Sequence, residues 1–148
     1  KEALFNILAN RIDFEEKSVL DLFAGTGNIS YEFASRGAKS IVCVEQNGTN
    51  STFIRDTAED LKFKNISVVR NDVFTFLSRC TNTFDIIFAD PPFQLEGINT
   101  LPEQVFHHNL LNKDGLLIIE HGEMTDLSKL PNFTEHRKYG NVHFSFFK

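Results

Sequence analysis

Short apolar runs alternate along this chain with longer stretches in which apolar residues recur every three or four positions. The short runs have the length and composition typical of β-strands. They occupy residues 18–23, 40–45, 66–71, 84–89 and 115–120. The periodic stretches predict helices, and they occupy residues 28–36, 47–61, 73–80 and a part of 102–111. This alternation indicates βαβ units with a parallel sheet, which is the α/β fold class.

The two ends of the chain depart from this alternation. Apolar residues at helical spacing predict an opening helix that ends at Asp13; they are Leu4, Phe5, Ile7, Leu8 and Ile12. At the other end, the runs 133–139 and 142–147 flank Gly140 and Asn141, a pair that favours the two-residue turn of an antiparallel hairpin. The hairpin and the five parallel strands together predict a mostly parallel sheet of seven strands in a single domain over residues 1–148.

Composition and charge limit the setting and the partners. Of the 148 residues, 41% are apolar, which is sufficient for the core of one domain. No apolar run approaches the ~20 residues of a membrane-spanning helix, and the start of the chain does not resemble a signal peptide, so we expect a cytoplasmic protein without a membrane partner. The net charge of −5, from 15 basic and 20 acidic residues, counts against a nucleic-acid partner. We expect a monomer. We expect no metal site, because no histidine has a partner at a metal-ligand spacing.

The loop after the first strand has the residues of a nucleotide-binding site. Its glycines permit positive φ and let a ligand approach the backbone at a helix N-terminus. The predicted cofactor-binding residues here are Asp21, Phe23, Ala24, Gly25, Thr26, Gly27 and Asn28. A dinucleotide-binding loop would need a glycine or alanine where this chain has Ser30, whereas the acidic Asp21 suits the ammonium of an amino-acid-bearing cofactor. A turn whose glycines serve only chain reversal is the alternative.

Acidic residues follow the second and third strands as well. Glu45 is placed to accept both hydroxyls of a ribose, and Asp72 is placed to accept from an adenine amino group. We include their neighbours Gln46 and Val73 among the cofactor-binding residues. Both acids could instead serve the N-termini of the helices that follow them.

The fourth strand ends in the most specific motif, Asp90-Pro91-Pro92-Phe93. Each proline fixes its own φ and restricts the residue before it, so the turn is rigid. A rigid turn can hold the Asp90 carboxylate and a backbone carbonyl as two acceptors for the hydrogens of an exocyclic amino group, while Phe93 offers a ring for base stacking. We take these four residues as the catalytic site, with a structural Pro-Pro turn as the alternative.

Together these motifs resemble the class I, Rossmann-like methyltransferases, and more closely the RsmD-type methyltransferases of bacterial 16S ribosomal RNA. The resemblance extends from the first helix through residues 35–38 to the glycine at position 140. It implies helices on both faces of the sheet, S-adenosyl-L-methionine (SAM) as the cofactor, and transfer of a methyl group to the N2 amino group of a guanine. It also implies ribosomal RNA or the small ribosomal subunit as the partner. Members of that family usually carry a basic segment ahead of the first helix, and this sequence begins at Lys1 without it.

Three other functions compete with this one. An adenine-N6 methyltransferase of DNA or RNA can use the same tetrapeptide, although no room for an added target-recognition region appears between Asp90 and the terminal hairpin. A noncatalytic SAM-binding module for ribosome assembly would retain the fold. An NAD-dependent oxidoreductase is disfavoured by Ser30 and by the lack of an evident catalytic pair.

Overall fold

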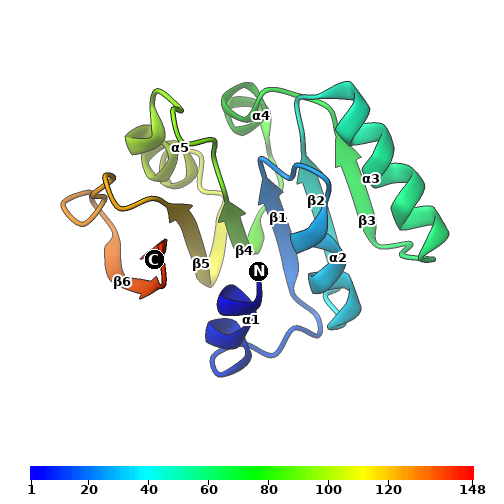
Figure 1. Ribbon diagram of the computed structural model, residues 1–148, viewed down its shortest axis with the longest axis horizontal. Helices are drawn as coiled ribbons and strands as arrows, with labels where there is room; N and C mark the ends of the chain where they lie inside the picture. The colour runs from blue at the N-terminus through cyan, green and yellow to red at the C-terminus, as the bar shows by residue number, and fades with distance from the viewer.

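The computed structural model describes all of residues 1–148 and contains one seven-stranded mixed sheet with helices on both sides (Figure 1). The strands are β1 (Ser18–Leu22), β2 (Ser40–Val44), β3 (Ile66–Val69), β4 (Phe84–Ala89), β5 (Leu111–His121), β6 (Phe133–Tyr139) and β7 (Val142–Phe147). Their order across the sheet is β3-β2-β1-β4-β5-β7-β6. The predicted α/β fold class and the seven strands are therefore confirmed.

The order of the parallel strands places a ligand site. Strand β1 pairs with β2 on one side and with β4 on the other, and all pairs from β3 to β5 are parallel. The chain thus winds away from β1 in one direction first and then in the opposite direction. At such a switch point the loops after the two central strands diverge and leave a crevice. The loop after β1 and the turn after β4 lie on either side of this crevice.

Helices cover both faces, as the sequence predicted. They are α1 (Glu2–Ala9), α2 (Asn28–Ser35), α3 (Gly48–Asp60), α4 (Val73–Arg79) and α5 (Leu101–His107), with a 3₁₀ turn η1 (Ile98–Thr100) before α5. Helices α1, α2 and α3 contribute to one apolar cluster and α4 and α5 to the other. Alternate residues of the central strands enter opposite clusters: in β4, Phe88 packs with the first and Ile87 with the second. A strand buried on both faces needs this continuous apolar run.

The C-terminal hairpin completes the sheet with antiparallel strands. Strand β7 pairs with β5 and carries β6 at its outer side. Five of the six residues of β7 are buried, whereas β6 alternates partly buried and exposed residues, as an edge strand does. The turn is at the predicted place, and Gly140 has a φ of +61°, which suits a glycine.

Two predicted boundaries were wrong. Helix α1 ends at Ala9, three residues before Ile12, because the N–H groups of Arg11 and Ile12 both donate to the Leu8 carbonyl and close the helix there. Ile12 nevertheless packs against the core, which explains its periodic position. Strand β5 begins at Leu111, before the predicted start at residue 115, and residues 112–115 form an irregularity inside it, where pairing with β4 shifts. None of the helices combines the length and apolar character needed to cross a bilayer.

Candidate active site

The loop after β1 has the backbone geometry of a ligand-binding turn. Phe23, Gly25 and Gly27 have φ values of 57°, 60° and 90°. At Gly27, the N-cap of α2, a Cβ atom would lie 2.7 Å from the ring of Tyr31, whose hydroxyl donates to the Thr26 carbonyl at 2.7 Å. At Gly25 an added Cβ would meet nothing within 4 Å, so this part of the loop is open to a ligand. The φ at position 27 thus favours glycine, and a Cβ atom there would also displace the Tyr31 ring.

Glu45 joins this loop to the start of α3. One of its carboxylate oxygens accepts from the N–H of Gly25 at 2.8 Å, and the other accepts from the N–H of Asn47 at 2.8 Å. The position of Glu45 in the sequence predicted either a ribose contact or a role at the start of the following helix, and the second is present. The N-cap itself is Asn47, which accepts from the N–H of Asn50. Each carboxylate oxygen retains a further lone pair, so a ribose contact is compatible with both bonds.

Asp21 lies beneath the loop and is buried, with 1% exposure. Its carboxylate accepts from the Ser30 hydroxyl at 2.7 Å, and Ser30 in turn accepts from the Cys43 thiol at 2.9 Å. Burial raises the pKa of Asp21 to about 7, and the negative charges of Asp90 and Glu45 add to this effect. A buried carboxyl group beside two others is an environment that a cationic ligand would stabilise.

The remaining predicted cofactor residues take ordinary structural positions. Asp72 is the N-cap of α4, and one of its oxygens accepts from the N–H and the hydroxyl of Thr75 at 2.9 and 3.2 Å. The alternative capping role is therefore present, and the second oxygen remains for a ligand. Val73 is buried in the core. Gln46 is exposed at the same end of the sheet, between Glu45 and α3.

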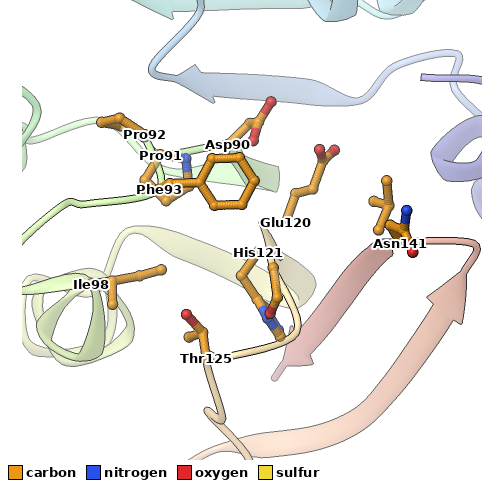
Figure 2. Close-up of a pocket in the computed structure, with 11 residues that line it drawn as sticks. Asp90, Pro91, Pro92, Phe93, Ile98, Glu120, His121, Thr125 and Asn141 are labelled. Atoms are coloured by element: carbon orange, nitrogen blue, oxygen red, sulfur yellow. The ribbon is translucent and has the colours of Figure 1, made fainter.

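The turn Asp90–Phe93 leaves β4 on the other side of the crevice. Pro91 is buried and anchors the turn, while the Phe93 side chain is 93% exposed. Figure 2 shows its ring standing beside the carboxyl group of Asp90. Gly122 makes room for this ring, because a Cβ atom there would lie 2.9 Å from it. An exposed aromatic ring held over a glycine can stack on a planar ligand.

Glu120 is the site residue that the sequence analysis missed. Ala89 pairs with Ile119 in the parallel ladder, so the residues that follow, Asp90 after β4 and Glu120 near the end of β5, lie side by side. Burial raises the pKa of Glu120 to about 7, and the Asp90 carboxylate raises it further. The pKa of Asp90 is also raised, first of all by burial. The other site residues were predicted because ligands bind at the carboxyl ends of parallel strands. Glu120 is the last residue of the fifth predicted strand, so the same rule would have found it.

These residues enclose a cavity of about 240 Å³. Its lining consists of Asp90, Pro91, Pro92, Phe93, Ile98, Glu120, His121, Gly122, Thr125, Asn141 and Val142. Four segments build it: the turn after β4, η1, the end of β5 and the tip of the β6–β7 hairpin (Figure 2). Sites that enclose whole drug-sized ligands have volumes of ~300–1,000 Å³. The cavity therefore suits a smaller planar group, and its charged lining residues are acidic.

Three histidines form a stack across the C-terminal strands, and one of them, His121, also lines the cavity. His121, His136 and His143 come from three neighbouring strands and stack with ring centroids 4.9 to 5.9 Å apart. His136 and His143 share a hydrogen bond of 2.8 Å, and His121 bonds Ser145 at 2.7 Å. No three histidine, cysteine, aspartate or glutamate side chains are arranged to hold a metal ion.

Comparison with known proteins identifies the family. The model of a family described as "Conserved hypothetical protein 95" matches residues 1–148, which is the whole chain. The chain belongs to this family. Together with the relatives named below, this match confirms the resemblance to RsmD-type methyltransferases that the motifs indicated.

Individual members of the family are similar over most of their length. The chain is 29% identical over 153 residues to "Ribosomal RNA small subunit methyltransferase D" of Buchnera aphidicola subsp. Baizongia pistaciae, covering 99% of this chain and 76% of the relative. It is 31% identical over 143 residues to the protein of the same name in Escherichia coli strain K12, covering 93% of this chain and 69% of the relative. The solved structure "Putative methyltransferase yhhF from Escherichia coli" superimposes with a TM-score of 0.86 at 25% identity, over 99% of this chain and 81% of that one. The chain thus has the Rossmann-like methyltransferase fold.

Proposed function

We propose that this protein transfers a methyl group from SAM to the N2 amino group of a guanine in the RNA of the small ribosomal subunit. The observation that carries the proposal is the position of Asp90. Its carboxyl group lies at the switch point of the sheet, in a base-sized cavity, and is close enough to Asp21 of the neighbouring strand β1 to influence the ionisation of Asp21. The names of the relatives support ribosomal RNA as the substrate.

The charges of the site favour SAM over a dinucleotide. SAM carries an ammonium and a sulfonium group, whereas NAD carries a negative pyrophosphate. The negative charges of Asp90 and Glu45 both act to raise the pKa of Asp21, and the adjoining cavity is lined by no lysine or arginine. Such a site attracts a cation and repels a pyrophosphate. The residues present therefore fit SAM.

Named residues have distinct parts in holding the cofactor. We assign the backbone of residues 24–27 to the amino-acid portion, with Asp21 compensating its positive charge from below. Glu45 accepts the ribose hydroxyls with its remaining lone pairs, and the second oxygen of Asp72 accepts the adenine amino group. Bound SAM supplies a methyl group on a positively charged sulfur.

The turn after β4 supports the attack on this methyl group. The lone pair of a guanine amino nitrogen is delocalised into the ring, so the nitrogen must become pyramidal before it attacks. Asp90 and a backbone carbonyl of the turn accept its two hydrogens, favour that geometry and stabilise the positive charge that develops. Bound SAM would supply the methyl group for the new C–N bond and leave as S-adenosylhomocysteine, and Asp90 is placed to take the proton that the nitrogen releases. A paired base is inaccessible, so the target base is unstacked, and Phe93 replaces its lost stacking.

The test compares the wild-type protein with Asp90→Ala on small-subunit particles, free 16S ribosomal RNA and duplex DNA. We expect wild-type transfer to the ribosomal substrates and none with Asp90→Ala, while SAM binding persists in both. The matched control is Asp56→Ala, which removes an exposed carboxylate from α3 and is expected to leave transfer unchanged. Full activity of Asp90→Ala would overturn the mechanism, and transfer to duplex DNA alone would overturn the substrate.

A further inference from the structure

Two carboxyl groups face the same cavity from adjacent strands. Asp90 follows β4 and Glu120 lies near the end of β5, and the parallel register places them next to each other. They are close enough for each to influence the pKa of the other. In Figure 2 both carboxyl groups point to the same side, near the ring of Phe93. The proposed function uses only Asp90 of this pair.

The other acids of the site accept hydrogen bonds from the protein backbone, whereas Asp90 and Glu120 do not. Glu45 and Asp72 accept from backbone N–H groups. No backbone hydrogen bond acts on the ionisation of Asp90 or Glu120, and the cavity lining contains no lysine or arginine. The rise in the pKa of Glu120 to about 7, caused by burial and by Asp90, is the expected result of this shortage of donors. A ligand with two adjacent N–H groups would provide them.

Other polar groups of the lining are less suited to accept a hydrogen from the base. Both ring nitrogens of His121 already have partners, at 2.9 Å from the Gly122 carbonyl and 2.7 Å from the Ser145 hydroxyl. Asn141 is at the exposed tip of the hairpin. Glu120 is thus the second strong acceptor beside Asp90.

Guanine carries the matching pattern. Its Watson–Crick edge presents the N2 amino group directly beside the N1–H, so two donors face the site together. Adenine presents one amino donor beside N1, which is an acceptor without hydrogen. A carboxylate next to the acceptor of the amino group therefore favours guanine and repels the lone pair of adenine N1.

We propose that Glu120 is the specificity-determining residue of the site, accepting the N1–H of the target guanine while Asp90 and the adjacent carbonyl hold its N2 amino group. This inference rests on the proposed function, because it assumes that a guanine enters the cavity. In addition to the role of Asp90, Glu120 disfavours bases that offer an amino group without a neighbouring N–H.

The experiment uses 2-aminopurine, which keeps the 2-amino group but has no hydrogen on N1. The substrates are an RNA that contains the guanine methylated by the wild-type protein, and the same RNA with 2-aminopurine at that position. A hydrogen bond to a charged acceptor changes kcat/KM by about 10- to 100-fold. We expect the wild-type protein to prefer guanine by that factor, and Glu120→Gln, whose amide can donate to N1, to reduce the ratio of the two kcat/KM values to about 1.

The ratio separates base reading from damage to the fold, because a general loss of activity lowers both values together. Glu123→Gln, at an exposed acid three residues further on, is the matched control and is expected to retain the wild-type ratio. A wild-type protein that uses both RNAs equally would overturn the inference even if the variant failed to fold, and so would a Glu120→Gln protein that keeps the preference for guanine. In both cases the proposed function stands, whereas a wild-type protein that methylates no guanine overturns both proposals.

Discussion

Replacing Asp21 by asparagine should stabilise the protein at neutral and alkaline pH while weakening its binding of SAM. The carboxyl group is buried, and its hydrogen bond from Ser30 is one that an asparagine oxygen can also accept. Asparagine has nearly the same shape and never ionises. The substitution therefore removes the cost of a buried charge and leaves the packing in place.

The magnitude follows from the pKa. Burial raises the pKa of Asp21 to about 7 in the folded protein, whereas an aspartate in an unfolded chain titrates at ~3.9. Between these values the folded protein binds the proton more tightly than the unfolded chain, so the free energy of unfolding decreases as the pH rises from ~4 to about 7 and then levels off. A difference of about three pKa units corresponds to roughly 4 kcal/mol, which is the upper limit of the expected gain in Asp21→Asn at pH 8.

Urea unfolding at pH 4, 6 and 8 measures this difference, and calorimetry measures SAM binding. We expect Asp21→Asn to match the wild-type protein at pH 4, to exceed it at pH 8 and to bind SAM more weakly. The control is Asp85→Asn. Burial acts to raise the pKa of Asp85, but hydrogen bonds from Ser18 and Asn112 outweigh it and lower that pKa, so this variant should be destabilised at pH 8. Equal or lower stability of Asp21→Asn at pH 8 would refute the reasoning.

Three further substitutions test the geometry of the site. Gly27→Ala forces a side chain to a φ of +90° and to 2.7 Å from the Tyr31 ring, so we expect a loss of about 1–3 kcal/mol in urea unfolding together with weaker SAM binding; an unchanged protein would contradict the close approach. Phe93→Ala removes an exposed ring, so the melting temperature should stay the same while kcat/KM for RNA falls about 10-fold or more, and a fall in stability alone would indicate a packing role. Gly122→Ala places a Cβ atom 2.9 Å from the Phe93 ring and should lower kcat/KM without changing SAM affinity, a split that steady-state kinetics and calorimetry resolve.

Local patterns in the sequence were sufficient to predict most elements and the separate parts of the site. Apolar runs such as 84–89 are buried on both faces and have the composition this requires, and the glycines at 25 and 27 are in positive-φ positions as the loop motif predicted. The apolar pattern also extended the first predicted helix too far, because Ile12 packs against the core after the helix has ended.

What the sequence analysis missed depends on which strands are neighbours. Glu120 is 30 positions after Asp90, and only the pairing of β4 with β5 brings the two carboxyl groups together. The same holds for the hairpin. Its turn was predicted from Gly140 and Asn141, but the insertion of β7 between β5 and β6, which stacks His121 with His136 and His143, follows from burial of five of the six β7 residues.

The most direct test of the proposed function is identification of the methylated nucleoside. Small-subunit RNA is incubated with the protein and SAM carrying an isotopically labelled methyl group, digested to nucleosides and separated by mass spectrometry. The account predicts label in N2-methylguanosine, and none when Asp90→Ala replaces the wild-type protein. Label in N6-methyladenosine, or no labelled nucleoside from a protein that binds SAM, would contradict it.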